Sequence, residues 1–79
     1  MANTRREQPR RLARKLLAIR QNLGLSQTEM ARALKLKVSY TVVSGYELGT
    51  NEPNLLVLLR YARLARVPVD NLIDDKLDI

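Results

Sequence analysis

Residues 26–49, SQTEMARALKLKVSYTVVSGYELG, carry the signals of two short helices joined by a turn with two lysines. Ser26 and Glu29 have the spacing of a capping box, in which each side chain bonds a free backbone N–H at the helix start. Ser39 stands at the corresponding cap position of the second helix, and Gly49 at its end. The stretch therefore predicts two consecutive short helices.

The second of these helices has a poor intrinsic helix propensity. Residues 40–43 are Tyr-Thr-Val-Val, and Gly45 in a helix interior costs about 1 kcal/mol relative to alanine. We therefore expect tertiary packing to hold this helix, and its exposed side to serve a purpose other than stability.

The flanking sequence predicts three further helices. Pro9 suits a first helical turn and Gly24 a helix end, and the apolar stripe between them is Leu12, Leu16, Ile19 and Leu23. A later stripe is formed by Leu55, Leu58, Leu59 and Ala62, and a short helix is expected over 70–73. The predicted fold class is all-α, with five helices around one aliphatic core. The expected organisation is a flexible basic arm at 1–8, a domain at 9–73 and a tail at 74–79.

Composition narrows the function classes. The chain has no cysteine and no histidine, which excludes disulfides and thiolate sites and argues against zinc sites and most acid–base or nucleophilic catalysis. We predict neither an enzyme nor a cofactor. No apolar run reaches the roughly 18–20 residues of a membrane span, so a cytoplasmic protein is expected.

The charge is unevenly distributed. Residues 1–37 carry ten basic and two acidic side chains, a net +8, whereas residues 38–79 carry four and six, a net −2. With a sequence pI of about 10.3, such concentrated basic charge is typical of a nucleic-acid-binding protein. Alternatively, it is only a solvated basic face.

The segments IRQNLGLSQTEMARAL, VSYTVVSGYELG and EPNLLVLLRYARLARVPVDNL together resemble the phage-repressor/Cro-like (Xre) helix-turn-helix family over residues 12–73. The resemblance implies a lambda-repressor-like domain whose second helix of the pair enters the major groove of double-stranded DNA. Three departures stand out: the longer turn at 35–37, Arg66 where a helix-ending glycine is usual, and Leu48 where a polar or basic residue is common.

A helical wheel centred on Val43 as the buried residue places Thr41 and Gly45 on the opposite side, flanked by Ser44 and Leu48 on one side and by Val42 on the other. We expect Thr41 and Ser44 to hydrogen-bond bases, and the methyl groups of Thr41 and Val42 to contact thymine. Tyr40 is expected at a base or phosphate. Alternatively, Val42 and Tyr40 belong to the core.

The resemblance implies that Gln27 bonds a phosphate at the start of its helix, although it could simply face water. Lys35 and Lys37 are expected at phosphates, with a guanine as a second option for Lys37, or else are solvated loop residues. The predicted DNA-binding set is completed by Thr28, Ser39, Thr50 and Asn51, and by the arm residues Arg5, Arg6, Arg10 and Arg11.

The family resemblance also implies that Arg20 and Glu47 pair and lock two helices together; the alternative is two exposed charges of little energetic value. Self-association as a homodimer is predicted through the apolar residues Leu56, Val57, Leu72, Ile73, Leu77 and Ile79. Alternatively, these residues complete the core.

Two functions follow as hypotheses. The first is a sequence-specific DNA-binding repressor that acts as a homodimer on paired half-sites. The second is an antitoxin-like module that binds a second protein through its C-terminal surface and regulates its own operon. A membrane-surface role for the basic first helix is a weaker option.

Overall fold

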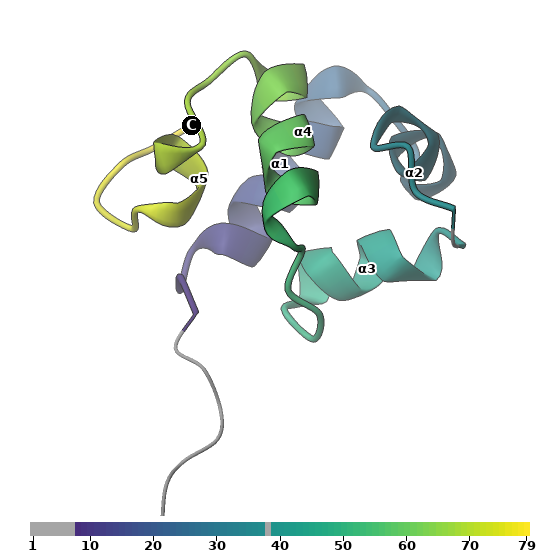
Figure 1. The fold of residues 1–79 in the computed structure, drawn as a ribbon, viewed down its shortest axis with the longest axis horizontal. Helices are drawn as coiled ribbons and strands as arrows, with labels where there is room; N and C mark the ends of the chain where they lie inside the picture. Colours follow the sequence, from purple (N-terminus) through teal and green to yellow (C-terminus); the bar gives the residue numbers. More distant parts are fainter. Residues whose placement is uncertain (1–7, 38) are drawn as a thin grey trace, which may run out of the picture.

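The computed structural model describes residues 8–37 and 39–79, and it confirms the expected all-α, five-helix fold in this part of the chain. The helices are α1 (Leu12–Leu23), α2 (Gln27–Ala33), α3 (Thr41–Leu48), α4 (Leu55–Ala65) and α5 (Asp70–Ile73). Figure 1 shows α4 in front of α1, with α3 below them and with α2 and α5 on opposite sides. None of the described helices is long and apolar enough to cross a membrane.

One aliphatic core connects all five helices. Its fully enclosed members include Leu16 from α1, Met30 from α2, Val43 from α3, Tyr61 from α4 and Leu72 from α5. Burial at about 25 cal/mol per Å² of apolar surface is the main stabilising term for a domain of this size. Because each helix contributes to the same cluster, none of the short helices has to be stable alone.

The first helix of the pair begins as predicted. The Ser26 hydroxyl accepts the backbone N–H of Glu29, and the Glu29 carboxylate accepts the backbone N–H of Ser26. These bonds lower the pKa of Glu29 below its usual range. The helix after the turn differs from its prediction, because it starts at Thr41 with Tyr40 as the N-cap residue. Ser39 lies one position earlier than this N-cap residue, but its hydroxyl still accepts the backbone N–H of Thr41 at 3.4 Å and contacts the Thr41 hydroxyl.

The prediction for the apolar face of α4 is partly wrong. It places Leu55 in the core, but this residue is 85% exposed, and it places Val57 on a dimer surface, where the structure buries it. The reason lies at the start of the helix, where Asn54 caps the backbone N–H of Val57 and fixes the first turn. The buried face consists of Val57, Leu58, Tyr61 and Ala62.

Arg66 resolves one departure from the family pattern. It ends α4 in the left-handed conformation, with φ 60°, and its own N–H bonds back to Arg63. Lys35 takes the same conformation in the turn after α2, with φ 58°. Both positions carry a cost that a glycine would avoid, since left-handed backbone is unfavourable for side chains with a Cβ.

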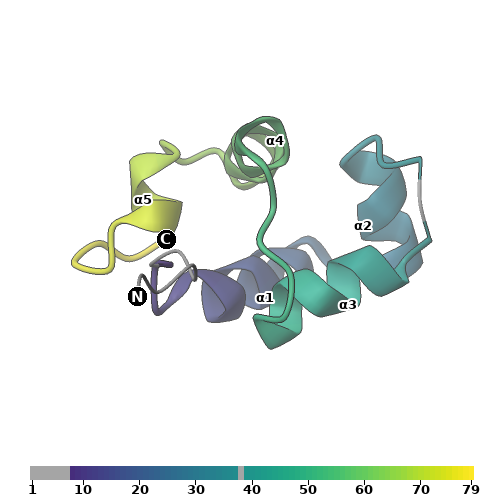
Figure 2. The ribbon, with the colours of Figure 1, turned by 60° about the horizontal axis from the view of Figure 1, so that its bottom comes forward.

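The C-terminal tail holds the start of α1. The Asp75 carboxylate accepts the backbone N–H groups of Arg10 and Arg11, and so caps a helix whose own N-cap residue has no capping side chain. The buried amine of Lys15 donates to two backbone carbonyl oxygens at and just after α5, at 2.7 and 3.0 Å. We call the contacts of Asp75 and Lys15 the tail clamp; it brings the two ends of the described chain together (Figure 2).

Candidate nucleic-acid interface

The centre of the candidate interface is α3, which the structure supports from behind. Val43 and Tyr46 are buried, and the Tyr46 ring packs edge-on against that of Tyr61, with ring centroids 6.4 Å apart. A helix of low intrinsic propensity is thus held by packing on one side. Thr41 on the other side is exposed, and Ser44 is half-buried.

Arg20 and Glu47 form the predicted pair. The Arg20 Nε–Glu47 Oε2 distance is 2.6 Å, the Nη2–Oε1 distance is 3.0 Å, and the side chains are 17% and 5% exposed. Arg20 also donates to the carbonyl of Leu25, between α1 and α2. The hydrogen bond to Glu47 raises the pKa of Arg20 further above its usual range. One guanidinium therefore joins α1 both to α3 and to the loop that leads into α2.

Gln27 does not simply face water, as the alternative had it. Its side-chain amide donates to Glu47 Oε1 at 3.1 Å, so it joins the Arg20–Glu47 pair and is half-buried. The amide remains at the start of α2, where a helix N-terminus favours anions. Glu47 is the only charged residue of α3, and both of its carboxylate oxygens are engaged by these partners.

Other positions of the predicted set differ in exposure. The exposed residues are Thr28, Lys35, Lys37, Ser39, Tyr40, Thr41, Thr50 and Asn51. Val42 is half-buried and packs against the core, as the alternative had it, whereas Tyr40 is 50% exposed and is not a core residue. Gly45, expected to face outward, is buried. An added Cβ there would lie 2.4 Å from the Asn51 amide nitrogen, so the side chain of Asn51 covers it.

The arm prediction divides into two parts. Arg5 and Arg6 lie outside the described residues. The side chain of Arg11 is taken up by the C-terminal tail, because it donates to the carbonyl oxygens of Asp75 and Leu77 and pairs with the Asp78 carboxylate. Its guanidinium is therefore engaged within the chain, although the side chain is 44% exposed, and its assignment to DNA stays a prediction. Arg10 is bound to Asp75 through its backbone N–H, and the residue is exposed.

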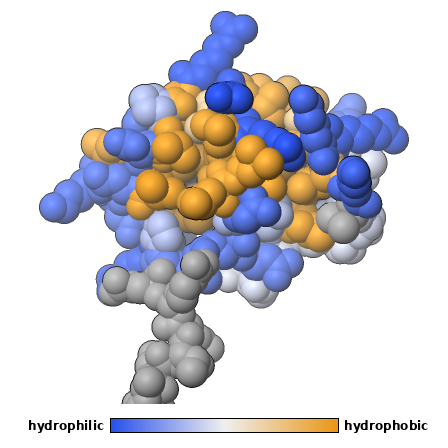
Figure 3. Space-filling view, viewed as in Figure 1, coloured by the Kyte–Doolittle hydropathy of each residue, from blue (hydrophilic) through white to orange (hydrophobic). Residues whose placement is uncertain are grey.

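The predicted dimer surface also needs correction. Val57 and Leu72 are buried in the core at 4% and 0% exposure, so neither is accessible to a second chain. The other members, Leu56, Ile73, Leu77 and Ile79, are 39–53% exposed. Figure 3 shows a broad apolar area on the face that carries α4.

Sequence reasoning missed two contacts, one between α4 and the end of α2 and one on α3 itself. Arg60 of α4 donates to the carbonyl oxygen of Leu34 at the end of α2, at 2.9 Å. The side chain of Asn51 lies on Gly45, although the two residues are six positions apart. The glycine within a helix was the signal for the second contact, since it marks a place where another group approaches the backbone closely. Nothing in the pattern signals the first.

Comparison with known proteins identifies the family and relatives of this chain. A helix-turn-helix family model matches residues 16–72. The antitoxin HigA1 of Mycobacterium tuberculosis, from strains CDC 1551 and H37Rv, is 42% identical over 57 residues, which is 72% of this chain and 37% of the relative. The matched stretch thus spans little more than a third of the curated relatives.

A solved structure shares the fold. The P22 c2 repressor, crystallised in complex with a synthetic operator, superimposes with a TM-score of 0.71. The match covers 81% of this chain and 94% of that one, at 22% sequence identity. The arrangement of short helices is therefore common to both chains, while most side chains differ.

Proposed function

Because this chain belongs to the helix-turn-helix family, of the Cro/C1 type, we propose that it is a sequence-specific regulator that binds double-stranded DNA and represses transcription as a homodimer. One observation carries the proposal. The only charge on α3 is held by Arg20 and Gln27, which leaves an uncharged helix side with Thr41 exposed and Ser44 half-buried. Such a side can approach base edges without removing an unpaired charge from water.

In the proposed complex α3 lies in the major groove. Thr41 and Ser44 hydrogen-bond base edges there, and Lys35 and Lys37, both in the turn before α3, neutralise phosphates. The start of α2, with Gln27, faces the sugar–phosphate backbone of the DNA, since a helix N-terminus attracts a phosphate. The basic arm adds affinity that does not depend on sequence, through Arg5, Arg6 and Arg10.

The proposed homodimer uses the exposed part of the apolar face, Leu56 with Ile73, Leu77 and Ile79. These residues come from α4, α5 and the tail. A single helix contacts only a few base pairs, and a two-fold dimer would place two α3 helices on half-sites one helical turn apart.

Selection of bound sequences from a random DNA pool tests the function directly. We expect a palindromic motif, because a symmetric dimer requires two equivalent half-sites. The paired Thr41→Ala, Ser44→Ala variant should lose the motif and keep its melting temperature. Asn22→Ala, an exposed change on α1, serves as the control. A wild-type chain that enriches no sequence would refute the proposal.

The basic arm has its own test. Removal of one phosphate contact should flatten the slope of log K against log salt by about 0.9. A chain that starts at residue 9 lacks Arg5 and Arg6, so we expect a slope smaller by about 2. An unchanged slope would remove the arm from the interface.

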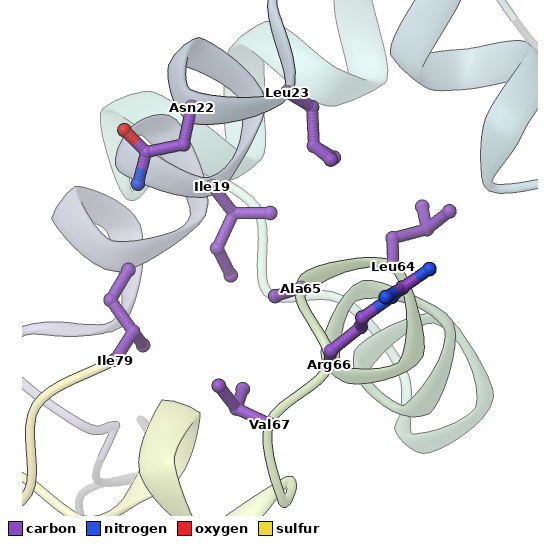
Figure 4. Close-up of a pocket in the computed structure, with 8 residues that line it drawn as sticks. All are labelled: Ile19, Asn22, Leu23, Leu64, Ala65, Arg66, Val67 and Ile79. Carbon is purple, nitrogen blue, oxygen red and sulfur yellow. The ribbon is translucent and has the colours of Figure 1, made fainter.

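A second candidate function is an antitoxin-like module that binds a partner protein, which is supported by the 42% identity to antitoxin HigA1. A groove of about 450 Å³ provides a site for such a partner. As Figure 4 shows, Ile19 and Leu23 of α1 face Leu64 and Val67 across it, with Ile79 at one end. Native mass spectrometry of the chain purified from its own cells distinguishes the two: a stoichiometric second protein favours the module, and a homodimer alone the repressor.

A further inference from the structure

The loop after α3 folds back onto the middle of that helix. Gly49 ends α3 in the left-handed conformation, with φ 80°, and the next two residues return to Gly45. The carbonyl oxygen of Gly45 accepts the backbone N–H groups of Thr50 and Asn51, at 3.0 and 3.2 Å. Asn51 is therefore fixed on α3, although it follows the helix in sequence.

The side chain of Asn51 takes the place that a side chain at position 45 would occupy. A Cβ built on Gly45 would lie 2.4 Å from Asn51 Nδ2, which is shorter than any normal contact, and 3.0 Å from its Cγ. Gly45 does not have positive φ, so the backbone conformation does not require a glycine. The Asn51 side chain instead fills the space that a Cβ at 45 would need, so a larger residue there would force that side chain to move.

The Asn51 amide lies on the side of α3 that is proposed to face the DNA bases. Residues 41 and 45 are one turn apart and share a side of the helix, so Asn51, packed on Gly45, lies on the same side of α3 as Thr41 and one turn further along. The residue is exposed, and its side-chain amide makes no hydrogen bond within the part of the chain that the structure describes. An amide with a free donor and a free acceptor can bond the N6 and N7 atoms of adenine together.

We propose that Gly45 and Asn51 form one composite base-reading element, in which the loop residue supplies the amide and specifies an adenine. The inference depends on the proposed DNA-binding function, and it adds the residue and the base that set one position of the site. It also explains why a helix of poor propensity contains a glycine: a side chain at 45 would displace the group that reads the base.

Affinities for the selected site and for its single-base-pair derivatives test the proposal. Asn51→Ala should lower discrimination at one A·T pair by about 10- to 100-fold, because one good amide–adenine pair has that value. The other positions should keep their preferences. Because the amide is neutral, the dependence on salt should not change.

Gly45→Ala supplies the second arm, since it pushes the Asn51 side chain off α3 without altering it. We expect the same loss at the same base pair, and the double variant should be no worse than either single one. Asn22→Ala is the matched control, an exposed asparagine on α1. Circular dichroism melting shows whether each variant is folded, and the exposed Asn51→Ala keeps the test valid if Gly45→Ala unfolds.

Two results would overturn the inference while leaving the proposed function intact. In the first, Asn51→Ala selects the wild-type motif with unchanged affinity. In the second, it weakens all derivatives by one common factor, which would identify a phosphate contact and not base reading. Failure of the wild-type chain to select any motif would instead refute DNA recognition itself.

Discussion

Two arginine–carboxylate contacts within residues 8–37 and 39–79 join distant segments, and they lie in opposite environments. Arg20 and Glu47 are 17% and 5% exposed and connect α1 with α3, whereas Arg11 and Asp78 are 44% and 82% exposed and connect the start of α1 with the tail. Water screens the second pair, and removal of a partner from the first leaves a charge in a place that cannot solvate it. Burial, more than geometry, separates a structural ion pair from a surface one.

The largest effect is expected at Glu47. Glu47→Ala should lower the free energy of unfolding by about 3–5 kcal/mol, because the Arg20 guanidinium then stays partly buried without its partner. Chemical denaturation at neutral pH measures this change. Arg11→Ala is the matched change in the exposed pair and should shift the melting temperature far less; equal shifts would contradict the distinction.

Lys15 is the buried member of the tail clamp. Its side chain is 4% exposed and its amine holds two carbonyl oxygens of the α5 region, so Lys15→Ala should cost about 1–3 kcal/mol. Lys15→Met keeps most of the volume and removes the donor. If the two variants are equally destabilised in thermal unfolding, hydrogen bonding accounts for the effect; a stable methionine variant would assign it to packing.

Tyr61 is the opposite case, a buried polar group whose removal is expected to leave stability unchanged or to raise it. Its hydroxyl is buried and has no hydrogen-bond partner among the described residues, and burial is the main cause that raises the pKa of Tyr61 above its usual range. Tyr61→Phe removes an unsatisfied polar group, so we expect an unchanged or higher stability, by up to about 1 kcal/mol. A clear decrease in melting temperature would show that the hydroxyl has a partner, such as a bound water.

The smallest effect at neutral pH is expected at the exposed carboxylates of the tail. The backbone N–H groups of Arg10 and Arg11 lower the pKa of Asp75, and the bond to Arg11 lowers that of Asp78. Their stabilising contribution is complete above the ordinary value of 3.8 and is lost as the pH falls through the lowered pKa values. Asp75→Asn should flatten the decline of melting temperature below that pH.

Local patterns were enough for much of the fold. The capping box at Ser26 and Glu29, the stop at Gly24 and the stripe that begins at Leu12 depend on neighbours within one or two turns. The buried face of α4 was harder, because a small shift in the first turn decides which of its residues point inward. The Arg20–Glu47 pair was predicted from the family resemblance alone, because no spacing along the chain predicts a contact between residues 27 apart.

The candidate site was less predictable for the same reason. Wheel geometry placed Thr41 and Gly45 on one side of α3, but only the return of the loop shows that Asn51 covers the glycine. Likewise, the density of arginines in the first fourteen residues indicated an arm, while the tail engages Arg11.

The amino-acid sequence was sufficient for what depends on local free energies: five short helices, the capping box of α2, a basic first half and an uncharged side of α3. Tertiary structure decided which of those groups remain available. It buried Val57 and Leu72, assigned Gln27 to Glu47 and Arg11 to the tail, and placed Asn51 on Gly45. The physical reason is that contacts between distant residues form only after the core has fixed the helices, so the sequence pattern alone does not show which side chains they engage.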